Sequence, residues 1–135
     1  MNVHVFIFLA LIDRATKGWA LSTLAPASEP AFFSLALYFN SGISFSLLEA
    51  HPGISTAVAL AGAGIFGLLC LRTRFAHMPG IAFLWAGALG NLMDRIVYGH
   101  VIDWIYVGGY INLADIWLCI GCLLIFVRCL QSEIS

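Results

Sequence analysis

Charged residues are scarce in this chain of 135 residues. Asp, Glu, Lys and Arg make up 10% of it, hydrophobic residues make up 61%, and the mean hydropathy is +0.97. A soluble domain is roughly 25% charged and 45–50% apolar, so this composition argues against one. The formal net charge of -1 provides neither a basic surface for nucleic acid nor an acidic surface for cationic partners. The scarcity predicts an integral membrane protein that does not bind nucleic acid.

Motifs for several kinds of chemistry are also missing. The chain has neither HExxH nor a glycine-rich phosphate loop. Its four histidines are scattered and only His100 lies near other polar residues, which argues against a serine or cysteine nucleophile with a histidine base. The four cysteines lie in or at the end of apolar runs, and Cys119 and Cys122 form a CxxC with no second pair. These cysteines indicate neither a zinc cluster nor a disulfide framework.

Four apolar segments have roughly the length of membrane spans, since a helix needs about 20 residues to cross the hydrocarbon. They cover residues 3–24, 54–71, 80–95 and 113–130. Small residues four apart, such as Ala82, Ala86 and Gly90, let neighbouring helices approach closely. The pattern predicts a single integral membrane domain over residues 1–135, all-α apart from a small β element.

The basic residues do not orient these spans by number alone. An even number of spans places both termini on one side of the membrane. Arg72, Arg74 and Arg128 mark one side, and Arg14, Lys17 and Arg95 mark the other. If the second set is retained for a functional site, the first set places both termini in the cytoplasm.

The β element is predicted from alternation in two connecting segments. Over residues 32–48, apolar and polar or small residues alternate on either side of Ser41 and Gly42, which is typical of paired strands. A second extended segment covers residues 101–112. Because an open sheet edge cannot face lipid, we expect this element at the membrane interface or packed on the helices.

Polar residues are concentrated between Gly87 and Asp115, a stretch that holds three of the seven acids. At the end of the third span, Asn91, Asp94 and Arg95 are three and four residues apart and therefore project from one side of a helix. In the first span, Asp13 and Lys17 have the i, i+4 spacing of a helical ion pair. The alternative for both groups is a helix end that reaches the interface.

Gly108 and Gly109 indicate a two-residue hairpin turn. Such a turn would place Val107 opposite Tyr110, and continuing the register brings Asp103 within one residue of Asp115. Two close, partly buried carboxylates tend to share one proton, which is the state that an aspartic protease needs. One carboxylate would take a proton from water while the other donates to the developing oxyanion.

Two other interpretations remain open for these acids. Asp103 could end a strand while Asp115 caps or begins a helix. The chain could also be a non-catalytic four-span membrane protein whose buried acids, with Arg95, form a structural or proton-relay network.

Five motifs, taken in order, carry a resemblance to a known family. They are DRATK in the first span, NSGISF in the first extended segment, GALGNLMDR in the third span, GHVIDW after it and NLAD at the start of the fourth. With these motifs the chain resembles lipoprotein signal peptidase, or signal peptidase II, the aspartic endopeptidase of bacterial membranes.

The resemblance implies a fold, a substrate and a location. The fold is four transmembrane helices with a short extracytoplasmic β-cradle, and both termini lie on the cytoplasmic side of the bacterial cytoplasmic membrane. The active site lies near the extracytoplasmic face, among membrane lipids. We expect a monomer, because four packed helices would already use the small-residue faces. Its substrates are prolipoproteins that carry a diacylglyceryl group, cut just before the lipidated cysteine. No metal or organic cofactor is implied.

The resemblance also assigns roles to residues of this chain. The catalytic pair is Asp103 and Asp115. The residues implied to line the site and hold lipid and peptide are Asn40, Gly42, Asn91 and Arg95. Those implied to support the site are Asp13, Lys17, Asp94, Asn112 and Ala114.

Overall fold

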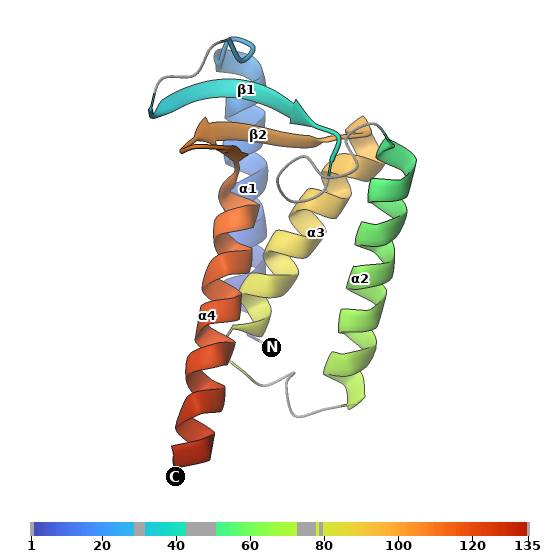
Figure 1. The fold of residues 1–135 in the computed structure, drawn as a ribbon, viewed down its shortest axis with the longest axis vertical. Coiled ribbons are helices and arrows are strands. Elements are labelled where there is room, and N and C mark those ends of the chain that lie inside the picture. Colours follow the sequence, from blue (N-terminus) through green and yellow to red (C-terminus); the bar gives the residue numbers. More distant parts are fainter. Residues whose placement is uncertain (1, 29–31, 43–50, 73–77, 79, 135) are drawn as a thin grey trace.

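The computed structural model describes residues 2–28, 32–42, 51–72, 78 and 80–134. Its elements are α1 (Val3–Thr23), β1 (Ser34–Asn40), α2 (Pro52–Arg72), α3 (Ile81–Tyr98), β2 (Val101–Tyr106), β3 (Tyr110–Ile111) and α4 (Leu113–Ile134). The three strands form one sheet in the order β1-β2-β3. Figure 1 shows this sheet across one end of the helices, while the two termini lie away from it. The part of residues 32–48 after Gly42 that was predicted as a strand lies outside the described residues.

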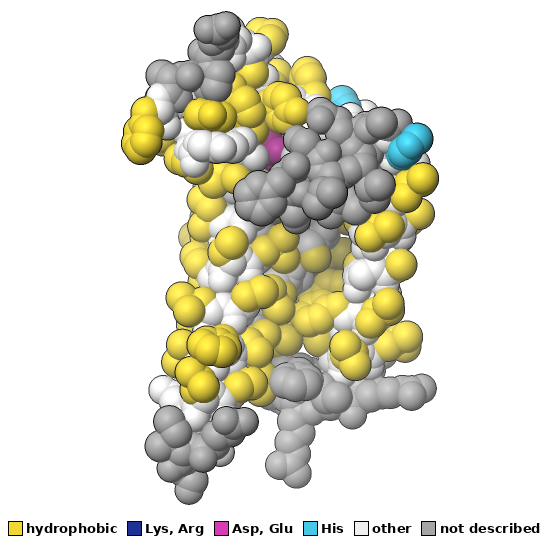
Figure 2. All heavy atoms as spheres, in the orientation of Figure 1, with side chains coloured by type: hydrophobic (Ala, Val, Ile, Leu, Met, Phe, Trp, Pro, Cys, Tyr) yellow, Lys and Arg dark blue, Asp and Glu magenta, His cyan; other side chains and the backbone are white. Residues whose placement is uncertain are grey.

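The helices present hydrophobic side chains outwards. Phe8, Leu11, Ile65, Leu123 and Phe126 are each 60–63% exposed. In Figure 2 such side chains cover most of the described helix surface, and an acidic side chain is visible beneath the strands. In the described part of the chain, the stretches Gly53–Cys70 of α2 and Leu113–Ser132 of α4 are long and apolar enough to cross a membrane. The crossing of all four helices stays a prediction.

The third helix is longer than the predicted segment 80–95. It continues to Tyr98, and Gly99 follows in the left-handed conformation with φ 79°, donating its N–H to the carbonyl of Arg95. Glycine ends helices in this way because it has no Cβ to clash there. The polar group Asn91, Asp94 and Arg95 therefore lies within the last two turns of α3, and not at its end.

The predicted two-residue turn between β2 and β3 is wrong. Tyr106 pairs with Tyr110 and Ile105 with Ile111, which leaves a three-residue loop in which Gly108 has φ 85°. A three-residue hairpin loop needs one residue in the left-handed region, and glycine occupies it without strain. Since β3 ends at Ile111, the approach of Asp103 to Asp115 does not come from a continued ladder.

The sheet packs on the helices through a small buried core. β1 pairs antiparallel with β2, which places Tyr38 opposite Asp103. Beneath them, Ala20 of α1 packs with Leu37, Ile102 and Trp104 of the two strands. This packing fixes β2 across the ends of α1 and α3, which is where the acids lie.

Candidate active site

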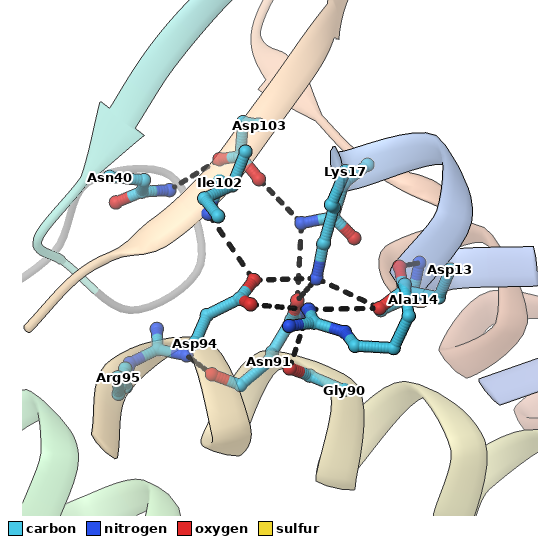
Figure 3. A network of polar contacts seen from close by, with 12 residues as sticks. Asp13, Lys17, Asn40, Gly90, Asn91, Asp94, Arg95, Ile102, Asp103 and Ala114 are labelled. Carbon is cyan, nitrogen blue, oxygen red and sulfur yellow. Dashed lines mark hydrogen bonds and ion pairs between the residues drawn. The ribbon is translucent and has the colours of Figure 1, made fainter. Parts of the chain in front are cut away.

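Four aspartates from four different elements meet beneath the sheet. Asp13 of α1, Asp94 of α3 and Asp103 of β2 are at most 1% exposed, and Asp115 of α4 is partly buried. Figure 3 shows the network of contacts around three of them. Burying an acid is costly unless hydrogen bonds or opposite charges compensate, so the partners of each carboxylate define its role.

Asp103 is held by amide groups. Its Oδ2 accepts from Asn40 Nδ2 at 2.9 Å, and its Oδ1 accepts from Asn112 Nδ2 at 2.5 Å. Burial, followed by the neighbouring charge of Asp115, raises the pKa of Asp103 to about 7 from its ordinary 3.8. Near neutral pH this carboxyl group can therefore hold a proton.

Asp115 is fixed by the start of its own helix. The Asp115 N–H donates to Asn112 Oδ1 at 3.1 Å, and Asp115 Oδ2 accepts from the Asn112 N–H at 3.0 Å. This reciprocal pair is a capping box, in which the residue before the helix and the third helical residue satisfy each other's backbone donors. The other oxygen, Oδ1, accepts from Asn91 Nδ2 at 2.8 Å. The prediction that Asp115 caps a helix and the prediction that it lies beside Asp103 are thus compatible.

Asn112 joins the two carboxylates. Its side-chain nitrogen donates to Asp103 while its backbone nitrogen donates to Asp115. The same side-chain nitrogen also donates to Asn91 Oδ1 at 3.1 Å. We call Asp103 and Asp115 the amide-held pair, because the hydrogen bonds described to their carboxylates come from amide groups.

The other two aspartates are paired with cations. Lys17 Nζ, which is on a side chain only 1% exposed, lies 3.1 Å from Asp13 Oδ2 and 2.7 Å from Asp94 Oδ2. Arg14 bridges the same two acids and donates to the Gly90 carbonyl at 3.5 Å. We call Asp13, Arg14, Lys17 and Asp94 the charge-paired cluster.

Each acid of this cluster also holds the backbone next to the amide-held pair. Asp13 Oδ1 accepts from the Ala114 N–H at 3.1 Å, and Asp94 Oδ2 accepts from the Ile102 N–H at 3.3 Å. Ala114 directly precedes Asp115, and Ile102 directly precedes Asp103. The cluster therefore fixes the positions of both carboxylates through the main chain.

Arg95 forms the side of the site towards β1. Its Nη2 donates to the Gly42 carbonyl at 2.7 Å and its Nη1 to the Asn91 carbonyl at 3.3 Å, while its Nε is buried without a hydrogen-bond partner among the described residues. The Gly42 N–H donates to Asn40 Oδ1 at 2.9 Å. Asn40 thus connects this side of the site to Asp103.

The structure brings the eleven residues expected from the sequence into one connected network; they are Asp13, Lys17, Asn40, Gly42, Asn91, Asp94, Arg95, Asp103, Asn112, Ala114 and Asp115. Sequence reasoning gave no site role to Gly90 or Ile102, and it considered Arg14 only as one of three basic residues that a site could retain. Arg14 follows Asp13 directly, so helical spacing alone does not direct it to the same face. Gly90 and Ile102 act through backbone groups, for which the side-chain pattern gives no signal.

The described residues include no group of three or more His, Cys, Asp or Glu side chains arranged to hold a metal ion. The cations that face the acids are protein groups, namely Lys17 and Arg14.

Helices with hydrophobic outer faces and a buried pair of carboxylates joined by amide donors have the arrangement of a membrane aspartic peptidase. The chain belongs to the signal peptidase II family, because the family model described as Signal peptidase (SPase) II matches residues 5–131.

Individual proteins of similar sequence or fold support this family assignment. A lipoprotein signal peptidase of Clostridioides difficile is 34% identical, over 98% of this chain and 97% of that protein. One from Chromobacterium violaceum is 39% identical, over 67% of this chain and 64% of that protein. A solved bacterial membrane enzyme has the same fold, with a TM-score of 0.75 at 24% identity over 97% of this chain and 88% of that chain. These relatives do not favour the non-catalytic interpretation.

Proposed function

We propose that Asp103 and Asp115 are the catalytic pair with which this chain, a membrane aspartic peptidase, removes signal peptides from prolipoproteins. The observation that carries the proposal is Asn112, which donates to both carboxylates at once. Two carboxylates held so close cannot both ionise at low cost, so the pair keeps one proton.

The proton is placed on Asp103. This residue is fully buried and its pKa is raised to about 7, so it is the acid that donates to the developing oxyanion of the peptide carbonyl. Amide donors hold both carboxylates, but Asp115 is only partly buried, so its ionised form costs less than that of Asp103. Asp115 is therefore the base that takes a proton from the attacking water.

The substrates are prolipoproteins that carry a diacylglyceryl group, and the cut falls just before the lipidated cysteine. Asn40, Gly42, Asn91 and Arg95 line the site for peptide and lipid. The buried Arg95 Nε supports this assignment, because it is a hydrogen-bond donor at the side of the site that has no partner in the part of the chain that the structure describes. Asp13, Lys17, Asp94, Asn112 and Ala114 support the pair through the contacts described above.

The chain crosses the bacterial cytoplasmic membrane four times as a monomer among membrane lipids, with both termini cytoplasmic and the site near the extracytoplasmic face. The position of both termini away from the sheet supports this orientation (Figure 1). Arg14 and Lys17 are engaged in ion pairs with buried acids, so they do not count as free basic residues for orientation.

The test is cleavage of a purified diacylglyceryl-modified prolipoprotein in detergent by wild type, Asp103→Asn and Asp115→Asn. Removing a general acid or base costs about 10²–10⁴-fold, and we expect losses at the upper end of that range in both variants. A thermal melt of each variant checks that the fold is retained. Undiminished cleavage by either variant would remove that residue from the pair, and binding without cleavage by wild type would favour a non-catalytic protein.

A further inference from the structure

Asn91 connects a buried cation to the base of the catalytic pair. Figure 3 shows its contact with Lys17. Its Oδ1 accepts from Lys17 Nζ at 3.0 Å, and its Nδ2 donates to Asp115 Oδ1 at 2.8 Å. An ammonium group has donors only, so it must face the oxygen of the amide. Once the oxygen is fixed on Lys17, the nitrogen faces Asp115.

Lys17 is itself held in one position. Its three donors match three acceptors, which are Asn91 Oδ1 at 3.0 Å, Asp13 Oδ2 at 3.1 Å and Asp94 Oδ2 at 2.7 Å. The side chain is only 1% exposed, so water does not compete for these donors. The ammonium group is therefore a fixed reference for the orientation of the Asn91 amide.

We infer that Lys17 is a positioning residue for signal-peptide cleavage, which acts through Asn91 to keep a hydrogen-bond donor on Asp115 and so to keep that carboxylate available as the base. The inference rests on the proposed function of the pair. If the amide turned over, its oxygen would face the Asp115 carboxylate, and two acceptors would oppose each other. A proton on Asp115 would relieve that repulsion and would remove the base.

Other titratable groups surround this connection and enter the test. They are Asp13 and Arg14 on α1, Asp94 and Arg95 on α3 and Asp103 on β2. Tyr38 of β1 lies opposite Asp103 in the sheet and stacks on Tyr110 of β3. The charge of Lys17 also lowers the pKa of Asp103, against the larger effects of burial and of Asp115. A variant at Lys17 therefore needs a control that removes the same charge elsewhere.

Arg14 provides that control. It lies on the same helix and contacts the same two acids, but its hydrogen bonds go to Asp13, Asp94 and the Gly90 carbonyl and not to Asn91. Arg14→Met and Lys17→Met each remove one positive charge from the charge-paired cluster. The two variants differ in whether the Asn91 amide loses its cationic donor.

The experiment measures two quantities in detergent for wild type, Lys17→Met, Arg14→Met, Asn91→Leu and the double variant Lys17→Met/Asn91→Leu. The first is the pH profile of kcat/KM for a diacylglyceryl-modified prolipoprotein. The second is an infrared titration of the protonated carboxyl band, assigned by its loss in Asp115→Asn, which does not require turnover.

A second comparison covers the case in which Lys17→Met fails to fold because it leaves two buried acids with one cation fewer. The double variant Asp13→Asn/Lys17→Met is compared with the single variant Asp13→Asn. In the double variant one negative and one positive charge are removed together. The amide introduced by Asp13→Asn keeps an oxygen that can accept from the Ala114 N–H. The same two quantities are measured for this pair of variants.

We expect Lys17→Met to move the acid limb of kcat/KM and the infrared midpoint to higher pH by about one unit. The cause is the loss of a nearby positive charge and of the Asn91 hydrogen bond that favours the ionised carboxylate. kcat falls about tenfold while KM changes little, which is the sign of an interaction used in the transition state. Arg14→Met leaves both midpoints near their wild-type values. In the Asn91→Leu background, adding Lys17→Met changes kcat/KM and the infrared midpoint little, because Lys17 acts through Asn91.

Equal shifts in Lys17→Met and Arg14→Met would overturn the inference, since charge alone would then explain them. An undiminished effect of Lys17→Met in the Asn91→Leu background would also overturn it. If wild type does not cleave but the infrared shifts follow the expected pattern, the proposed function fails, and the positioning of the Asp115 carboxylate by Lys17 stands.

Discussion

The amide-held pair and the charge-paired cluster each bury two carboxylates within one small region, but they treat the charge differently. In the cluster, Lys17 and Arg14 contact both acids, so the negative charges are matched in place. In the pair, the described hydrogen-bond donors are amide groups of Asn40, Asn91 and Asn112, which bring no positive charge. The charge of the pair is thus not matched by a cation in contact with it, and burial together with the charge of Asp115 raises the pKa of Asp103 to about 7.

The two regions are joined through the main chain. The Asp13 carboxylate binds the N–H that precedes Asp115, and the Asp94 carboxylate binds the N–H that precedes Asp103. We propose that the cluster holds the backbone on which the pair stands, while its Lys17 also acts on Asp115 through Asn91. The variants below test whether stability and activity divide between the two regions in this way.

The largest expected effect comes from removing an acid of the cluster. Asp94→Asn keeps the shape of the side chain but leaves Lys17 and Arg14 with Asp13 as their remaining described anionic partner. Breaking a buried ion pair by removing one partner costs about 3–5 kcal/mol. Asp103→Asn breaks no ion pair, but its new NH2 group must face the amide nitrogen of either Asn40 or Asn112, so the expected cost is smaller, about 1–3 kcal/mol.

Thermal melts of the two variants in the same detergent measure this difference. Melting temperatures lowered equally in Asp94→Asn and Asp103→Asn would show that the two regions do not divide stability and activity as described.

A smaller effect is expected where α3 passes closest to the cluster. A Cβ built on Gly90 would lie 2.7 Å from Asp13 Oδ2 and 3.4 Å from the Ala114 Cβ. Gly90→Ala therefore pushes the Asp13 carboxylate away from the Ala114 N–H, and overpacking of this kind costs about 1–3 kcal/mol. The expected result is a lower melting temperature and slower cleavage together, because Ala114 carries Asp115.

Gly64→Ala on α2 is the matched control, since a Cβ there meets nothing within 4 Å. Its melting temperature is expected to equal or slightly exceed that of wild type, because alanine favours the helix over glycine by about 1 kcal/mol. If both substitutions lowered the melting temperature alike, helix flexibility and not the contact with Asp13 would be the cause.

Spacing within one helix predicted part of this site from the sequence. The i, i+4 relation of Asp13 and Lys17 is an ion pair at 3.1 Å, as expected. The grouping of Asn91, Asp94 and Arg95 on one side is correct in outline, although the Arg95 head group turns to Gly42 while Asn91 and Asp94 contact Lys17.

The contacts between distant segments could not be derived from spacing. Asp103 meets Asn40 across 63 positions, and Asp13 meets Ala114 across 101. The predicted hairpin register failed because the loop has three residues and because Asn112 already begins the cap of α4. The motifs named residues that the structure brings into one network, whereas the capping box of Asn112 and Asp115, and the bond from Asn112 to Asp103, required the fold.

The mildest test changes only pH and compares the two regions within the unmodified chain. The pKa of Asp103 is about 7, so this carboxyl group is neutral below pH 7 and ionises above it, which leaves the pair without its acid. We expect kcat/KM to fall about tenfold per pH unit above that value, since loss of one required proton has that slope.

Stability changes in the same direction. The unfolded carboxyl ionises near 3.8 while the folded one keeps its proton to about 7, so the contribution of Asp103 to stability decreases as pH rises between these values. In Asp103→Asn this part of the pH dependence of melting disappears, while in Gly64→Ala it is retained. A wild-type kcat/KM that stayed constant from pH 6 to pH 9, about two units beyond the pKa of Asp103, would show that its proton is not used in cleavage.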